Sequence, residues 1–468
     1  MAQFRTKARA VDLLGKGQIA DLPTAITELW KNGYDAYADS LKAEVYLEES
    51  NSSRKSYFVI SDDGKGMSRK DILEKWLVLG TDSKSRAKIE QGESEETLWK
   101  RPRIKAGEKG IGRLSVAYLG SPMLMLTKKI GHPIQAMFFD WRLLENFNLF
   151  LDDIIIPIAE LTTATNFEHV FATLKNEFLK NFDIQKNTDG TIIWEDSQIV
   201  LKEIILSSVQ GATVDPAITE NLLQNIIDTD DHHGTKFLIF EPIQQITQLA
   251  EKDDDNLEDI RFVISSLSCF TNSFELSELN NQNRTIRTDF IIHKEVGVDY
   301  DLLTSQGNFF CAEDFDLSDV LIDGEFDGYG SFNGIIRIYD ECISYTYTNP
   351  RKKDKRNFYG RIPIKLGYSQ GEEKSSLLDE FSFTKLKDKI EAYGGLYIFR
   401  DGFRVLPYGR PNADFLGFEE RRSRRAGTFY FSYRRMYGYL DISRERNPHL
   451  KDKSSREGLI NNAQYRAF

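Results

Sequence analysis

Residues 24–39, TAITELWKNGYDAYAD, constrain the fold more than any other stretch of this sequence. Polar side chains recur there at helical spacing, so we predict a helix that carries a polar stripe along an otherwise apolar surface. The stripe consists of Glu28, Asn32, Asp35 and Asp39. Taken alone, such a stripe is most simply a solvent-facing surface, because most amphipathic helices have one.

Two glycine-rich turns downstream favour a binding site instead. A predicted strand over residues 57–60 runs into a turn, and a second cluster precedes another predicted helix. The first turn contains Asp62, Gly64, Gly66 and Met67, and the second contains Gly107, Gly110 and Gly112. Glycine lets the backbone approach a ligand closely, and amides at a helix start favour anions. The three stretches together predict a nucleotide site.

The residue types suggest a role for each side chain. Asp62, at the end of a buried strand, is suited to accept a hydrogen bond from the exocyclic amine of adenine. Asn32 offers a neutral oxygen to Mg²⁺, for which the phosphates supply the remaining charge. Glu28, one helical turn earlier, is placed to orient and deprotonate a water molecule.

Composition narrows the class of protein. The formal net charge of −11 argues against coating nucleic acid by bulk electrostatics, although a local basic patch remains compatible with it. Cys269, Cys311 and Cys342 have spacings typical of neither a metal site nor a disulfide framework. The sequence shows neither a signal peptide nor a membrane span. We therefore expect a cytoplasmic protein without membrane contact.

The rest of the first half alternates strands and helices. We expect a helix start at Pro23 or Thr24. Strands are predicted over residues 42–47, 57–60, 123–127, 134–139 and 233–240, and helices over 71–79 and 111–117. The charged segment 85–105 is interpreted either as a mobile flap or as a surface loop. Residues 141–231, with helical patterns over 167–182 and 216–227, form a predicted insertion of unknown role.

A second domain is predicted after an acidic run over residues 251–259. Its strands are expected near 333–339, 360–365, 395–405 and 428–442, with a helix around 383–393. Strands mixed with helices indicate an α+β domain.

The motifs resemble, in order, those of the GHKL superfamily, which includes gyrase, the ninety-kilodalton heat-shock chaperone, histidine kinases and MutL-type proteins. The motifs are Glu28-x-x-x-Asn32-x-x-Asp35, Asp62-x-Gly64-x-Gly66-Met67, Gly107-x-x-Gly110-x-Gly112 and Gly234-Thr235. The resemblance implies a two-layer Bergerat sandwich, a mixed sheet with helices on one face. It also implies an ATPase with ATP and Mg²⁺ as ligands.

The resemblance further implies residue roles. Glu28 would be the general base, Asn32 the magnesium ligand, and Asp62 the adenine contact, supported by Thr235. The glycine cluster would bind phosphates through Gly107, Lys109, Gly110, Ile111 and Gly112. The turn at residues 80–84 is similar to one in the MORC branch and related bacterial ATPases, which implies that Lys84 meets phosphate.

The second half resembles a transducer or middle domain. Residues 450–459 are similar to a loop whose arginine reaches the γ-phosphate, which implies a catalytic role for Arg456. A surface turn with ordinary ion pairs explains the same residues. We therefore divide the chain into an ATP-binding domain, 1–245, with the insertion 141–231, and a transducer-like domain, 246–468. The sequence given is also compatible with being the N-terminal part of a longer chain.

Two further features carry weaker signals. Histidines 232 and 233 lie on a strand and point to opposite faces, so we expect no metal there. Arginines and aromatic residues gather in residues 421–435, which suits either nucleic-acid binding or a strand edge protected by charge.

The leading functional hypothesis is a slow, Mg²⁺-dependent ATPase that closes and opens a dimeric clamp, in phage defence or DNA transactions. Its expected partners are ATP and ADP, a second copy of the chain on ATP binding, and a protein partner or DNA. The alternative is a nucleotide-sensing module for DNA or a protein partner without significant hydrolysis. Phosphate release with and without DNA separates the two.

Overall fold

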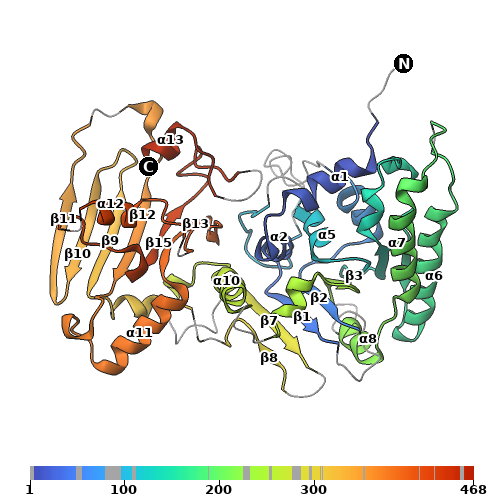
Figure 1. The fold of residues 1–468 in the computed structure, drawn as a ribbon, viewed down its shortest axis with the longest axis horizontal. Coiled ribbons are helices and arrows are strands. Elements are labelled where there is room, and N and C mark those ends of the chain that lie inside the picture. Colours follow the sequence, from blue (N-terminus) through green and yellow to red (C-terminus); the bar gives the residue numbers. More distant parts are fainter. Residues whose placement is uncertain are drawn as a thin grey trace. The chain divides into compact units, whose positions relative to one another are not determined.

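The structure is a computed structural model, and it describes most of the chain in two compact units. The described residues are 5–48, 55–79, 96–107, 112–187, 189–224, 232–251, 256–276, 286–294, 298–305, 307, 309–351, 354–410, 412–425, 427–453 and 458–468. Unit 1 comprises Met1–Asn256 and Thr285–Leu302, and unit 2 comprises Leu257–Arg284 and Leu303–Phe468 (Figure 1).

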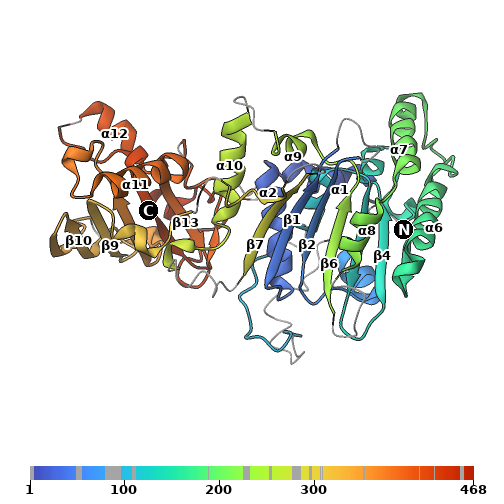
Figure 2. The same cartoon turned by 90° about the horizontal axis from the view of Figure 1, so that it is seen from below.

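Unit 1 is built on an eight-stranded mixed sheet in the order β5-β4-β3-β6-β2-β1-β7-β8. All neighbouring strands are antiparallel except β1 and β7, which are parallel. The strands are β1 (Ser40–Tyr46), β2 (Tyr57–Asp62), β3 (Met123–Lys128), β4 (Ile134–Phe139), β5 (Ile158–Leu161), β6 (Gly234–Ile239), β7 (Arg287–His293) and β8 (Tyr300–Asp301). Figure 2 shows β7, β1, β2 and β6 side by side in the sheet. The predicted mixed sheet with helices is confirmed.

Helix α2 (Leu22–Asp35) is the predicted polar-striped helix, but it is shorter than expected. The Asp21 side chain caps its first turn by accepting from the Thr24 backbone amide, and Pro23 lies in that turn. The helix ends at Asp35, and Tyr37 has a left-handed φ of 66°. Asp39 therefore lies beyond the helix, so its predicted place on the stripe is wrong.

The predicted insertion supplies an edge strand as well as helices. Strand β5 extends the sheet beside β4, which the sequence analysis did not anticipate. The helices are α6 (Phe167–Leu179), α7 (Ile199–Gly211) and α8 (Pro216–Leu223). Aromatic rings join α6 to the sheet, because Phe138 on β4 contacts Phe171 and Phe178 at centroid distances of 5.8 and 5.7 Å.

The two faces of the sheet carry different helices. Leu41 on β1 faces α2, whereas Glu44 on the same strand is bonded by Asn221 of α8. Because side chains alternate between faces along a strand, α2 and α8 cover opposite faces. The insertion thus places a helix on the face that α2 leaves uncovered.

Shorter helical segments complete unit 1. The predicted helix over residues 71–79 is a turn of α-helix, α3 (Arg69–Asp71), followed by π-helix over Ile72–Trp76. The predicted helix over 111–117 is 3₁₀-helix over Gly112–Ser115 continuing into α5 (Val116–Leu119). The others are α1 (Ala8–Leu14) and α9 (Gln244–Gln248).

Unit 2 is a seven-stranded sheet with helices, in the order β11-β10-β9-β12-β15-β13-β14. Its strands are β9 (Val320–Phe326), β10 (Phe332–Ile338), β11 (Glu341–Tyr347), β12 (Ile362–Tyr368), β13 (Gly395–Arg400), β14 (Phe403–Arg404) and β15 (Met436–Ile442). Its helices are α10 (Leu257–Ser268), α11 (Glu380–Tyr393), α12 (Phe418–Arg424) and α13 (Ala463–Ala467). Asp401 and Gly402 turn the β13–β14 hairpin with φ values of 53° and 85°.

The two units do not divide at one point along the chain. The predicted division has a single boundary after residue 245, whereas the first long stretch of unit 1 runs to Asn256 and residues 285–302 return to it. The return follows from the parallel pairing of β7 with β1. Within the described residues, no helix is both long and apolar enough to cross a lipid bilayer.

Truncating Phe138 should destabilise unit 1, because its fully buried ring joins the sheet to the insertion. We expect Phe138→Ala to lower the free energy of unfolding by about 3–5 kcal/mol. The matched control is Phe147→Ala, which removes a ring that is 39% exposed and should have a much smaller effect. Urea titration followed by circular dichroism measures both, and equal losses in the two variants would contradict the packing described here.

Candidate functional site

Glycine at position 33 lets α2 lie directly against the strand ends beneath it. A Cβ atom placed on Gly33 would lie 2.8 Å from the Asp62 Cβ and 2.5 Å from the Leu41 Cδ2. Real Cβ atoms do not approach neighbours so closely, so a larger residue would push the helix away. The absence of a side chain thus brings the turn of α2 that contains Asn32 to the end of β2.

Glu28 lies one helical turn before Asn32, on the buried side of α2. Only 3% of its surface is exposed, and its Oε1 lies 3.1 Å from the Lys31 Nζ. Asn32 itself is partly exposed. The predicted general base and the predicted magnesium ligand therefore follow each other along one helix, the first buried and the second reachable from outside.

Asp62 ends β2 and begins a tight turn. Its Oδ1 accepts a hydrogen bond of 2.9 Å from the Gly64 amide. A Cβ on Gly64 would lie 2.8 Å from the Ala36 Cβ, so this glycine also permits close contact with the end of α2. Gly66 has a left-handed φ of 63°, and a Cβ there would collide with the Lys128 carbonyl oxygen.

The Asp62 carboxyl group is poised to titrate near neutrality. Burial is the main cause that raises the pKa of Asp62 to about 7; the hydrogen bond from the Gly64 amide lowers the pKa, and the charge of neighbouring Asp63 raises it. Burying a carboxyl group costs stability, so a carboxyl with such a pKa is a candidate functional group.

Threonines on two adjacent strands lie in register with Asp62. Asp62 pairs with Thr235 on β6, and Thr235 pairs with Thr127 on β3. The Thr127 and Thr235 hydroxyl oxygens are 2.9 Å apart, and the Thr127 hydroxyl also accepts from the Met67 amide at 2.9 Å. Both threonines are buried. The strand ends thus present one connected row of polar groups.

Thr127 and Gly33 were not among the predicted site residues. A polar residue closing the apolar run MLMLT is the signal that could have identified Thr127. The signal for Gly33 is a glycine inside a helix, where it costs about 1 kcal/mol and calls for a packing reason.

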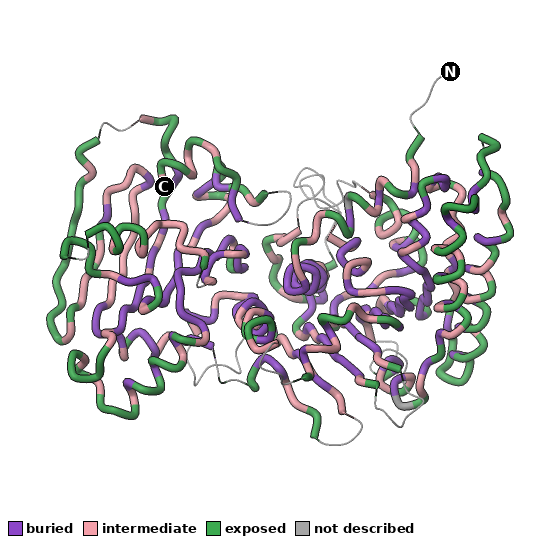
Figure 3. The backbone as a smooth tube through the Cα atoms, viewed as in Figure 1, coloured by how far each residue is buried: buried purple, intermediate pink, exposed green. Residues whose placement is uncertain are grey.

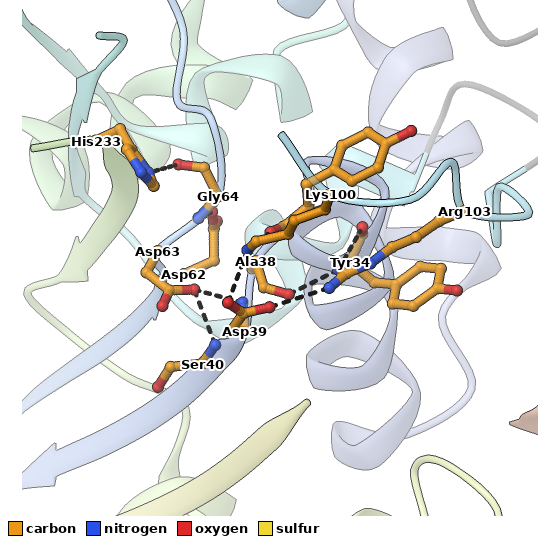
Figure 4. Close-up of polar contacts among 11 residues, drawn as sticks. Tyr34, Ala38, Asp39, Ser40, Asp62, Asp63, Gly64, Lys100, Arg103 and His233 are labelled. Atoms are coloured by element: carbon orange, nitrogen blue, oxygen red, sulfur yellow. Dashed lines mark hydrogen bonds and ion pairs between the residues drawn. The ribbon is translucent and has the colours of Figure 1, made fainter. Parts of the chain in front are cut away.

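Asp39 belongs to a polar cluster at the end of α2 (Figure 4). The Asp63 Oδ1 accepts from the Asp39 and Ser40 amides, each at 2.8 Å. The Asp39 carboxylate in turn lies 2.7 Å from the Lys100 Nζ and 3.1 Å from the Arg103 Nη2. The turn after β2, the chain between α2 and β1, and residues 100–103 are therefore bonded together.

Residues 100–107 cross the C-terminal end of α2 and cap it. The Arg103 guanidinium donates to the carbonyl oxygens of Tyr34 and Ala38, and the Lys105 ammonium donates to that of Asp35. Cations at this end of a helix offset its dipole and satisfy carbonyls that lack helical partners. Residues 100–105 belong to the segment 85–105 that was interpreted as a flap or a surface loop. The cations of Arg103 and Lys105 bind carbonyl oxygens at the end of the helix.

Asp35 holds the start of the second glycine cluster. Its two carboxylate oxygens accept from the amides of Ala106 and Gly107, at 2.7 and 3.1 Å. Gly107 is thereby brought to the same helix as Asn32, and Gly112 begins the 3₁₀-helix that packs against α2. The predicted positions Lys84, Lys109, Gly110, Ile111 and Arg456 lie outside the described residues.

His233 adjoins the site without being one of the predicted residues. Its Nδ1 lies 2.8 Å from the Gly64 carbonyl oxygen (Figure 4). Within the described residues, no cluster of histidine, cysteine, aspartate and glutamate could by itself hold a metal ion.

The arginine-rich segment is partly paired within its own helix. Arg424 forms an ion pair with Glu420, and Arg422 lies 3.8 Å from Glu419. Phe429 and Tyr430 are exposed beside them. The contacts favour a surface helix with charge pairs, and the nucleic-acid interpretation stays a prediction.

The titration of Asp62 should make stability depend on pH. Between its unfolded pKa near 3.8 and its folded pKa of about 7, the folded chain holds a proton that the unfolded chain releases. This contribution to stability is therefore present in acid and is lost as pH rises through the window. We expect the stability of Asp62→Asn relative to wild type to increase as pH rises through this window, from near zero at about pH 4 to about 4 kcal/mol at about pH 8.

Urea titrations of both proteins without nucleotide, at several pH values, measure this difference. Asp196→Asn, which changes an exposed carboxylate, is the control and should follow wild type. Parallel pH profiles for wild type and Asp62→Asn would contradict the assignment.

Part of the chain is similar to a known protein family. Residues 20–169 match a family described as "Histidine kinase-, DNA gyrase B-, and HSP90-like ATPase". A solved structure described as the N-terminal domain of a DNA repair protein aligns with 98% of this chain and 93% of its own, at 12% identity and a TM-score of 0.43. No curated protein matches the sequence. The predicted resemblance is thus confirmed: residues 20–169 are similar to the GHKL-type ATPases.

Proposed function

We propose that this chain binds ATP with Mg²⁺ where β2 ends beneath α2, and hydrolyses the nucleotide slowly. The observation that carries the proposal is the contact at Gly33, which brings the helix bearing Glu28 and Asn32 against Asp62. GHKL-type domains are ATP-binding domains, and the matched residues 20–169 include all three side chains.

The residues fit an adenine nucleotide. Glycines 64 and 66 let the turn after Asp62 pack directly against Ala36 and Lys128, which keeps the Asp62 carboxyl group close to the end of α2 for contact with a base. Ionised Asp62, whose Oδ1 is bonded by the Gly64 amide, would accept from the exocyclic amine of the base, and Thr235 lies opposite it on β6. The amide of Gly107, held on Asp35, begins the cluster expected to bind phosphate.

The residues also fit magnesium. Mg²⁺ takes few protein ligands when a triphosphate supplies others, so a single neutral oxygen from Asn32 suffices. Among the described residues, no cluster of three or more histidine, cysteine, aspartate or glutamate side chains could hold a metal ion without such a nucleotide. When bound, the ion would neutralise charge on the phosphates.

Glu28 is the residue that would act on water. Its buried carboxylate forms an ion pair with Lys31. Because Glu28 lies one helical turn before Asn32, the two side chains leave α2 on the same side. It would accept a proton from the attacking water, and the loss of such a base typically costs about 10²–10⁴-fold in rate.

Nucleotide state would then act as a switch. Residues 100–107 are bonded to the end of α2 and to Asp39, so a change at the site would reach them directly. In the proposed cycle, ATP closes a dimeric clamp between two copies, Arg456 docks on the γ-phosphate, and hydrolysis opens the clamp. Phage defence or a DNA transaction is the proposed setting, on the resemblance alone.

Removing the general base should separate binding from hydrolysis. We expect Glu28→Ala to retain ATP affinity within a few-fold while phosphate release falls at least about 100-fold. Glu177→Ala, which changes an exposed glutamate on α6, is the matched control and should keep wild-type turnover. Release is measured with and without added DNA. Equal turnover in Glu28→Ala and wild type would overturn the catalytic assignment, and no release from wild type under either condition would favour the nucleotide sensor.

Changing the base contact should weaken binding itself. We expect Asp62→Asn to reduce ATP affinity by about 10–100-fold, because a charge-assisted hydrogen bond contributes about 1.5–3 kcal/mol. Isothermal titration calorimetry with Mg·ATP at about pH 8, where the carboxyl is ionised, gives the comparison. GTP binding provides the specificity control, and an unchanged ATP affinity in the variant would show that Asp62 does not contact the base.

A further inference from the structure

Strand β11 (Glu341–Tyr347) is an open edge of the unit 2 sheet. Within the described part of the chain it pairs with β10 and with no other strand, and it stands first in the strand order. Every one of its residues is exposed, and Figure 3 shows the whole strand in the colour of exposed residues. Edge strands in soluble proteins are normally protected by lysine, proline or a bulge. Among residues 341–347 the only charged side chain is Glu341.

One face of this edge is apolar. Ile343, Tyr345 and Tyr347 alternate along β11, so they share a face, and they are 49%, 43% and 45% exposed. Ile338 of β10 extends the same face and is 46% exposed. Side chains of this kind are typical of strands that are covered, because β-branched and aromatic residues stabilise a sheet through cross-strand contacts.

The apolar face continues from the core of unit 2. Ile343 pairs with Ile336, which pairs in turn with Ile322 of β9 and then with Leu366 of β12, a core residue. Gly324 and Gly334 lie opposite each other on this face under the Phe332 ring. The edge is therefore an extension of a packed layer and suits the addition of a further strand.

The charges at the two ends of β11 are opposite. Asp340 and Glu341 lie at its start, and exposed Arg351 follows its end. A strand with an acidic start and a basic end is complementary to an antiparallel copy of itself, because each acidic end then meets a basic one. A parallel copy would instead place like charges together.

We propose that two copies of this chain associate through β11, antiparallel, about a two-fold axis at Ser344. This register places Ile343 of one copy opposite Tyr345 of the other on the apolar face, a favourable pairing of a β-branched with an aromatic residue. It leaves Glu341 opposite Tyr347, so no like charges meet within the strand pair. A two-fold interface of this kind closes on itself and gives a dimer.

The proposed dimer contact is independent of the nucleotide site. It lies within unit 2, and it requires neither ATP nor the residues of α2. It would hold two copies together in the absence of ATP, separately from any contact that nucleotide binding creates.

Charge substitution at the two facing positions tests both the interface and its register. Sedimentation velocity without nucleotide, over a series of concentrations, should show a reversible dimer for wild type. Ile343→Lys combined with Tyr345→Lys places lysine opposite lysine and should give a monomer. Ile343→Lys combined with Tyr345→Glu places lysine opposite glutamate and should restore the dimer at least in part.

Phe381→Lys is the matched control, since it charges a residue that is 77% exposed and belongs to helix α11, outside the strand pair. It should keep the wild-type dimer, and circular dichroism should show that all variants are folded. A wild-type monomer at every concentration, or an equal loss of dimer in both double variants, would overturn the proposal.

Cross-linking gives a second measurement that needs no dissociation. At the two-fold axis, Ser344 of one copy faces Ser344 of the other, so Ser344→Cys should form an intermolecular disulfide under mild oxidation. Cys342→Ser is introduced in the same chain to remove the exposed native thiol, and Cys269 and Cys311 are buried. Cys342→Ser alone is the control. The absence of cross-linked dimer in the Ser344→Cys variant would count against the register.

Discussion

The candidate site depends on the close contact between α2 and the strands beneath it. Helices usually stand off a sheet by the length of their side chains, and Gly33 removes that spacing at Leu41 and Asp62. Gly64 does the same on the opposite side of the contact, against Ala36. Because two missing side chains set this distance, the polar groups of the helix and those of the strand end share one small region. The cost of glycine inside a helix is offset by what the contact allows.

Hydrogen bonds then keep that region in place. Asp63 holds the chain between α2 and β1, Asp35 holds the segment before the second glycine cluster, and Arg103 caps the carbonyls at the helix end. Each of these bonds joins segments that are far apart in the sequence. The turn, the helix end and residues 100–107 consequently form one bonded assembly beside Asp62, whose raised pKa reflects the burial of its carboxyl group.

Local patterns predicted much of this arrangement. The strands over residues 57–60, 123–127 and 134–139, the capped start of α2 and the Asp401-Gly402 turn follow from periodicity and turn chemistry, which are properties of neighbouring residues. The end of α2 was predicted too late because Tyr37 leaves helical geometry, and the cations that cap the helix come from residues 100–105. Strand β5 was missed because it is short and forms by pairing with β4. Its own residues therefore show no strong strand pattern. Thr127 was missed because its partners lie on β6 and in the turn after β2.

The return of residues 285–302 to unit 1 limits how the protein could be dissected. A chain shortened after residue 256 would retain Glu28, Asn32 and Asp62 but would lack β7, and so would expose the flank of β1 that β7 covers. The amide of Arg287 also bonds the carbonyl of Asp39, beside the polar cluster. An excised nucleotide-binding fragment would therefore lose a supporting strand next to the region of interest, and its behaviour would not represent that of the intact polypeptide.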